Sequence, residues 1–560
     1  MSEGTEVRAP ERLLLAALVA LVSAPLVVWT TVGVLRSVAS LAGDAPMVTG
    51  AALIVALAVA GAQWSLAHRH RAAPLLIGVL LAGVGGGVLG SLVVGVALAV
   101  VAVASAAAVA WLPERVPEAL DGGLRRFPVW GAVVVVLSLA SVAQTTRVST
   151  FMGDPALPEL QTLPPLEGFA THSCLTAYSR ALDLAIEGAD NLYDAHWWPA
   201  LESGASSPEV EARFAPFDLD TFAYPPPFLL LARAGLVGTS DFADQRAVWF
   251  GLNTLFCLFG LWVMTQWIAP AHRPRPALAV PMVLLSPVLL VTLQIGNAHL
   301  TVTVMAALAM VAFDRGRLGV GGALLAMATL SKISPGILGI VLLARGEWRA
   351  AAWTAAWGVV LVAVSAAMFG VEPLQSFVTY QLPRLSSGEA LAFLADDPAE
   401  IATNIAPFGI PFKLELLGAA FPDVWAAARF VGNAYTLLVV AAAVLVGRRG
   451  GDRRMQLCMW LGLLAMGALR SPFAPPYAMF GAVVMWLLVL PEVRTRWQAV
   501  GWVAVLLAFQ GIPAMEPFAV SAAASLVGQI VAFGAVAWVL LRARPPRDAA
   551  EPRAAETLTS

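Results

Sequence analysis

The sequence is poor in charged residues. Only 12% of its 560 residues are Asp, Glu, Lys or Arg, whereas ordinary soluble domains carry about 25%. Hydrophobic residues make up 59% of the chain. A soluble globular protein is therefore excluded, and a membrane protein is expected.

The chain also lacks an excess of positive charge. It has 34 Lys plus Arg against 36 Asp plus Glu, for a net charge of −2. Lysine is almost absent, since Lys332 and Lys413 are the only two. Without a basic surplus there is little to neutralise a phosphate backbone, so the sequence predicts no nucleic-acid partner.

Cysteine is scarce as well. Cys174, Cys257 and Cys458 are far apart and have no CxxC spacing. The sequence therefore predicts no disulfide framework, no metal site and no cofactor.

Long apolar runs, in contrast, occupy most of the chain. About 20 apolar residues are needed for a helix to span a bilayer, and runs of this kind or shorter occur at 13–35, 48–67, 74–90, 91–111, 128–146, 247–269, 277–294, 299–313, 319–331, 335–344, 350–369, 427–446, 455–469, 478–490, 497–512 and 518–541. We expect an all-α polytopic membrane protein with about 12–16 membrane helices, several of them short or broken.

Arginine clusters in the short segments between these runs, as in the group from Arg448 to Arg454. Cytoplasmic loops carry the excess of positive charge. Placing the clusters inside puts both termini in the cytoplasm and the long segments 147–226 and 370–426 outside. The expected organisation is a cytoplasmic N-terminus at 1–12, N-terminal membrane helices at 13–146, a large outer loop with interfacial helices at 147–246, a membrane core at 247–541 that includes the outer loop 370–426, and a disordered cytoplasmic tail at 542–560.

Three apolar segments have polar interruptions between arginine-marked ends. The stretch from Arg317 to Arg345 contains Ser331-Lys332-Ile333-Ser334-Pro335-Gly336, where Pro removes a helix donor and Gly relaxes the backbone. We expect a hairpin with Lys332 at its apex. Residues 294–299 and 470–472 repeat the pattern, so Asn297, His299 and Arg470 become candidates as well. The alternative is that the cations extend to the lipid headgroups and that Asn297 and His299 are turn or capping residues.

The large outer loop carries further polar and aromatic candidates. Thr171 or Ser173 can cap a helix that runs to Glu187 and ends at Gly188, with His172 and Asp183 on one face. The prolines that follow Tyr224 predict an extended entry to a short interfacial segment at 228–237.

These stretches together resemble glycosyltransferase family 87, the polyprenyl-phosphate-dependent membrane glycosyltransferases of the GT-C superfamily. The likeness covers roughly Gly168 to Asn404 and implies a GT-C-like helical bundle. It depends on the order and spacing of several elements: Tyr178 followed by Gly188 to Asp194, Phe222 to Pro226, Gln294 to Asn297, Leu330 to Pro335, Arg345 to Arg349, and Leu382 to Ser386.

The resemblance implies transfer of a sugar, a mannose-like hexose or a pentose, from a polyprenyl-phosphate donor to a glycan or glycolipid hydroxyl on the outer face. It does not require a metal. Lys332, Arg384 and Arg470 are the cations available for the donor phosphate, and Tyr178, Tyr224, Asn297 and His299 are further candidates for substrate binding.

One departure concerns the general base. The family carries an acidic residue shortly before the position of Tyr178, but residues 171–175 contain no carboxylate. His172 is the local substitute, and Asp183, Asp194 and Asp218 are the carboxylate alternatives.

A lipid or solute transporter and a catalytically lapsed GT-C scaffold are the competing functions. Richness in Ala, Val, Leu and Arg indicates high-GC bacterial coding. Together with the apolar runs and the arginine distribution, this predicts a multi-pass protein of a bacterial inner membrane with its active site facing outside.

Overall fold

The computed structural model describes residues 145, 147–162, 168–199, 201, 207–236, 241–268, 286–391, 397–489, 496–511 and 516–542. Every regular element in these ranges is a helix, and they contain no strand. The all-α, polytopic prediction is therefore confirmed. The runs expected between 13 and 111, and nearly all of the run at 128–146, lie outside the described residues.

Within the described residues, four helices are long and apolar enough to cross a membrane: α11 (Phe242–Ile268), α17 (Trp348–Phe369), α22 (Val424–Arg448) and α26 (Phe518–Leu541). A fifth candidate is broken. It consists of α13 (Pro287–Gln294) and α14 (His299–Asp314), which meet at an angle of 112°. The predicted interruption at 294–299 is thus a sharp bend between two helices.

Shorter apolar helices complete the bundle. They are α15 (Leu318–Ser331), η3 (Ser334–Gly336) with α16 (Ile337–Ala344), α23 (Arg453–Ala468), η7 (Pro476–Met479) with α24 (Phe480–Val489), and α25 (Arg496–Phe509). The predicted break at 331–336 is confirmed, because α15 ends at Ser331 and a 3-10 turn precedes α16.

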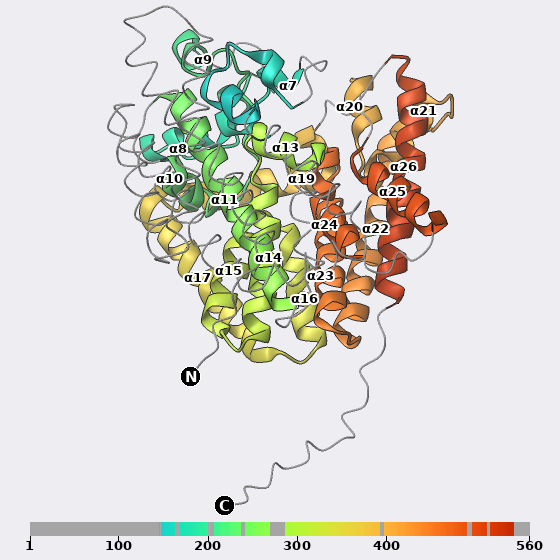
Figure 1. The fold of residues 1–560 in the computed structure, drawn as a ribbon. Coiled ribbons are helices and arrows are strands. Elements are labelled where there is room, and N and C mark those ends of the chain that lie inside the picture. Colours follow the sequence, from blue (N-terminus) through green and yellow to red (C-terminus); the bar gives the residue numbers. More distant parts are fainter. Residues whose placement is uncertain are drawn as a thin grey trace, which may run out of the picture.

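One end of the bundle carries a cap, which we define as the described residues between 168 and 236. Figure 1 shows α7, α8 and α9 gathered at this end, with α20 and α21 at the same end of the molecule. The helices of the cap are α7 (Gly168–Thr171), α8 (Cys174–Glu187), η2 (Ala195–Trp197), α9 (Pro208–Phe214) and α10 (Phe228–Leu236). The other short elements are η1 (Pro158–Leu160), α18 (Glu372–Ser376), η4 (Phe377–Gln381), α19 (Leu382–Ser387), α20 (Pro398–Thr403), η6 (Pro407–Gly409) and α21 (Ile410–Leu416).

The helix predicted in the outer loop is present with one correction. It ends where expected, at Gly188, which adopts a left-handed φ of 83°. It begins at Cys174, however, so the prediction that His172 lies on this helix was wrong. Ser173 takes the N-cap position in an extended conformation, and this places His172 in the link between α7 and α8.

The end of the bundle away from the cap is held by aromatic and ionic contacts. The Trp267 and Trp460 rings stack with centroids 5.3 Å apart, and Trp267 Nε1 donates a hydrogen bond of 2.7 Å to Asp314. Arg453 pairs with the same carboxylate at 3.5 Å, and Arg345 lies over the Trp460 ring. The last residues of α14 and α16 therefore meet at one end, as the predicted reversal at Lys332 requires.

Candidate active site

The bend between α13 and α14 is fixed by close contacts to the cap and to α11. Gly296 adopts φ 72°, and Trp249 Nε1 donates a 2.7 Å hydrogen bond to its carbonyl oxygen. A Cβ atom at this position would lie 3.3 Å from Leu175 and from Trp249. Glycine is therefore required here both by the left-handed backbone and by the tight packing.

Asn297 follows this glycine and connects several elements. Its Oδ1 accepts hydrogen bonds from Lys332 Nζ at 3.1 Å and from the His299 backbone N–H at 2.9 Å. Both partners are donors, so they orient the amide with Nδ2 on the opposite side. From there Nδ2 donates to Tyr477 OH at 3.2 Å and contacts Cys174 Sγ at 3.3 Å.

Lys332 directly follows the last residue of α15 and faces an aromatic ring of the cap. Its Nζ lies 5.3 Å from the centre of the Tyr224 ring, a distance at which a cation is attracted to the ring face. The Tyr178 and Tyr224 hydroxyls are 3.0 Å apart, and the Ala298 N–H donates to Tyr178. Burial raises the pKa of both tyrosines, so both are neutral hydroxyls at physiological pH.

Three chemically different side chains of the cap meet beside Asn297. The His172 ring nitrogen, the Cys174 sulfur and an Asp220 carboxylate oxygen lie within 4.8 Å of one another. Backbone contacts hold the Asp220 loop in place, since Asp220 N donates to Thr176 Oγ1 and Asp218 N donates to the Thr171 carbonyl, each at 3.0 Å. Burial, followed by the nearby Asp220 charge, raises the pKa of the Cys174 thiol.

Glu400 of α20 completes this set of ionisable groups. The pKa of Glu400 is raised, mainly because burial disfavours the charged carboxylate and secondly because of the negative charge of Asp397. The charge of His172 lowers this pKa, and that of Asp220 raises it. We call the set the polar cluster: His172, Cys174, Asp220, Tyr224, Asn297, Lys332, Glu400 and Tyr477. Its members come from the cap, from the two broken helices, from α20 and from the segment after α23.

The structure brings together only some of the residues predicted from the sequence. His172, Tyr224, Asn297 and Lys332 belong to the polar cluster, and Tyr178 touches it through Tyr224. The His299 backbone N–H donates to Asn297, and the buried His299 ring contacts the Ala478 carbonyl oxygen at 3.2 Å.

The other predicted residues have partners elsewhere. Asp183 pairs with Arg213, Asp194 lies 2.8 Å from His196, and Arg470 contacts Thr436 at 3.4 Å. Asp218, the remaining carboxylate alternative, is exposed, whereas Asp220 two residues later lies close to His172 and Cys174.

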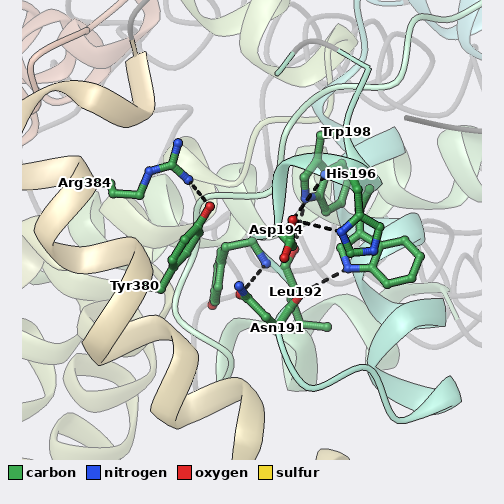
Figure 2. A network of polar contacts seen from close by, with 9 residues as sticks. Asn191, Leu192, Asp194, His196, Trp198, Tyr380 and Arg384 are labelled. Carbon is green, nitrogen blue, oxygen red and sulfur yellow. Dashed lines mark hydrogen bonds and ion pairs between the residues drawn. The ribbon is translucent and has the colours of Figure 1, made fainter. Parts of the chain in front are cut away.

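Arg384 belongs to a second group of polar contacts (Figure 2). Its guanidinium donates to Tyr380 OH at 2.6 Å and to Glu389 at 3.0 Å. Across from it lies the loop from Asn191 to Trp198, whose Asp194 accepts from the His196 backbone N–H. The Tyr193 and Phe377 rings, 5.7 Å apart, connect this loop to η4.

Sequence reasoning missed Cys174, Asp220, Glu400 and Tyr477. Asp220 lies two residues after the predicted candidate Asp218, and no local pattern in the sequence distinguishes the two carboxylates. Tyr477 closely follows the third predicted apex. Glu400 carries no local signal, because only the packing of α20 brings it to the cap.

A separate cavity lies between α25, α26 and the end of α23, lined by Leu469, Phe509, Ser525, Gln529 and Phe533 among others. None of its lining residues is ionisable. Proton transfer and phosphate binding need such groups, so the polar cluster is the better candidate for the chemistry.

Residues 222–472 match the family model of glycosyltransferase family 87. Comparison with curated proteins and with solved structures gives no significant match. The matched range contains Tyr224, Asn297, Lys332, Glu400 and Arg384, whereas His172, Cys174 and Asp220 precede it. The polar cluster therefore combines the matched domain with residues outside it. Residues 222–472 are therefore similar to a glycosyltransferase family 87 domain, and the described part of the chain includes helices long and apolar enough to cross a membrane.

Proposed function

We propose that this protein is a membrane glycosyltransferase that moves a sugar from a polyprenyl-phosphate donor to an acceptor hydroxyl, with the reaction at the polar cluster. The observation that carries the proposal is the contact between Lys332 and Asn297, which sets a cation at the meeting point of two broken helices beside the Asp220 and His172 side chains. Broken helices at membrane depth are tolerated where they line a protected polar site.

The proposed roles follow from the charges that develop during transfer. A departing sugar has an oxocarbenium-like transition state, and its phosphate gains negative charge as the bond breaks. Lys332 supplies a charge-assisted hydrogen bond to that phosphate. Asp220, with His172 beside it, accepts the proton of the acceptor hydroxyl.

The site is further proposed to face the outside of a bacterial inner membrane. The cap and the polar cluster lie at the end of the bundle opposite the contacts of Asp314 with Arg453. Arginine-rich ends favour the cytoplasm. A lipid-linked donor would reach the broken helices from the bilayer, and the acceptor would be a glycan or glycolipid on the outer face.

The test is transfer from labelled polyprenyl-phosphate sugars to membrane acceptors by the purified protein. Lys332→Met should lower turnover by about 100-fold, because one charge-stabilising contact is typically worth 10²–10³ in rate. Arg429→Met, which removes an exposed cation paired with Asp423, is the control and should retain turnover. We expect smaller losses for Arg384→Ala and Arg470→Ala, because these side chains contact Tyr380 and Thr436 instead.

Equal activity of the Lys332 variant and the wild-type protein would remove Lys332 from the phosphate site. Absence of transfer with every donor tested would favour the transporter or scaffold functions.

A further inference from the structure

The three cap residues of the polar cluster are different kinds of metal ligand at short range. An imidazole, a thiol and a carboxylate, from His172, Cys174 and Asp220, have ligand atoms within 4.8 Å of one another. This combination of nitrogen, sulfur and oxygen ligands is the type that binds zinc, whereas magnesium and calcium prefer oxygen ligands alone.

The sulfur-to-nitrogen distance also fits a tetrahedral ion. Zinc bonds of about 2.3 Å to sulfur and about 2.05 Å to nitrogen, at a tetrahedral angle, place the two ligand atoms about 3.6 Å apart. The Cys174 Sγ and His172 Nε2 atoms lie 3.6 Å apart. Little rearrangement of these two side chains would be needed for both to bind one ion.

The surroundings supply an outer shell for a bound thiolate. Asn297 Nδ2 contacts Cys174 Sγ at 3.3 Å, and the bonds from Lys332 and from the His299 N–H to Asn297 Oδ1 fix the direction of that amide. Outer-shell donors of this kind orient metal ligands and stabilise their charge. The Asp220 loop is already held by Thr176.

The charges balance as well. A thiolate at Cys174 and a carboxylate at Asp220 would neutralise a divalent ion. Lys332 directs its ammonium to the Asn297 oxygen and the Tyr224 ring. The ammonium group of Lys332 thus already has partners other than the three ligand side chains.

We propose that His172, Cys174 and Asp220 bind a zinc-class divalent ion with three protein ligands, and that the bound ion inhibits sugar transfer. Binding releases the Cys174 thiol proton to solvent and leaves a fourth position for water. The inhibition rests on the proposed function, because a carboxylate that coordinates the ion no longer accepts the acceptor proton. The metal site itself does not depend on that function. It departs from the sequence expectation of no metal, which followed from the spacing of the cysteines and from a family resemblance that does not require a metal.

The binding test uses Co²⁺ as a spectroscopic probe of the purified full-length protein in detergent. We expect one ion per chain, with the absorption of tetrahedral cobalt and a thiolate charge-transfer band. Cys174→Ser should abolish that band, and His172→Asn should weaken binding by at least about 100-fold, because even outer-shell changes cost 10–100-fold. His172 is half-buried in the link between α7 and α8, where a substitution disturbs folding less than in the buried core. His172→Asn therefore still tests the metal site if Cys174→Ser misfolds.

The controls are Cys257→Ser, a buried cysteine of α11, and His196→Asn, an exposed histidine paired with Asp194. Both should bind Co²⁺ as the wild-type protein does. Absence of a thiolate band, or equal affinity in the His172 variant and the His196 control, would overturn the site.

The inhibition test compares transfer with and without Zn²⁺ in each variant. Zinc should lower turnover of the wild-type protein and of Cys257→Ser, and Cys174→Ser should need at least about 100-fold more zinc for the same fractional loss. Activation by zinc, or an unchanged zinc response in Cys174→Ser, would overturn the inhibitory role. If no donor supports transfer, the cobalt spectrum still decides the metal site, so failure of the proposed function is distinguishable from failure of this proposal.

Discussion

Among single residues, the two carboxylates of Asp218-Leu219-Asp220 offer a matched comparison. Asp220 is half-buried within the polar cluster, whereas Asp218 is exposed. Asp220→Asn keeps the shape of the side chain but removes the proton acceptor, so we expect turnover to fall by about 10²- to 10⁴-fold under saturating donor. Asp218→Asn should retain turnover. If Asp218→Asn loses turnover and Asp220→Asn retains it, the general base is Asp218.

The two carboxylates preferred from the sequence enter the same assay. Asp183 and Asp194 are paired with Arg213 and His196, so Asp183→Asn and Asp194→Asn should retain most of the turnover. His172→Ala tests the imidazole separately from the carboxylate. A larger loss of turnover in His172→Ala than in Asp220→Asn would make His172 the general base.

Glu400 gives a prediction on the pH dependence of stability. Burial raises the pKa of its carboxyl, so the ionised form is less stable in the folded protein than in the unfolded chain. Its favourable contribution is fully present below the ordinary glutamate pKa of about 4.3 and is lost as the pH rises through the folded-state pKa. Glu400→Gln should therefore raise the thermal unfolding temperature above neutral pH and lose that advantage in acid.

The measurement is thermal unfolding of the detergent-solubilised protein across a pH series. Glu415→Gln, which changes an exposed side chain at the end of α21, is the control and should show no such trend. A stability gain that is the same at every pH would contradict burial as its cause.

Residues at helix breaks were predictable from the sequence, but their partners were not. Lys332 and Asn297 stand out because polar groups interrupt apolar runs there, and the structure joins them at 3.1 Å. Asp220 and Glu400 lie in polar segments where a carboxylate is unremarkable. Only the packing of the cap and of α20 on the broken helices gives these residues a shared environment.

At the scale of elements, the bend between α13 and α14 depends on Gly296. A side chain there would force a non-glycine residue into φ 72° and into contact with Leu175 and Trp249; the left-handed conformation alone costs about 1–2 kcal/mol. Gly296→Ala should lower the unfolding temperature and, by shifting Asn297, reduce turnover more than it reduces the amount of folded protein.

Gly251→Ala on α11 is the matched control. A Cβ atom at Gly251 would meet no other atom within 4 Å, and alanine favours a helix interior by about 1 kcal/mol. Stability and turnover should therefore be unchanged or slightly improved. Equal behaviour of the two variants would show that the bend does not require glycine.

Helix breaks and ends were also easier to predict than helix starts. Pro335 and Gly336 marked the break before α16, and Gly188 marked the end of α8, because proline and glycine act locally on the backbone. The start of α8 was set too early, since Ser173 and Thr171 are both acceptable caps in the sequence. Contacts with the Asp218 and Asp220 loop favour the later start.

For the whole molecule, the arrangement of the ends leads to a prediction of sidedness. The ends of α14 and α16 and the start of α23 meet around Asp314 and carry Arg345 and Arg453, while the cap lies at the opposite end (Figure 1). If arginine-rich ends face the cytoplasm, Gly451→Cys should be protected from a membrane-impermeant maleimide in intact cells, and Ser386→Cys should be labelled. Both positions are exposed in the structure, so the difference would report the membrane side and not burial.

The labelling background replaces Cys174, Cys257 and Cys458 by serine, and the unmodified background protein is the control for nonspecific reaction. Permeabilising the cells should make Gly451→Cys reactive and leave Ser386→Cys unchanged, because both sites then meet the reagent. Labelling of Gly451→Cys alone in intact cells would invert the molecule. The polar cluster would then face the cytoplasm, and the proposed use of an acceptor on the outer face would be wrong even if transfer from a polyprenyl-phosphate donor were observed.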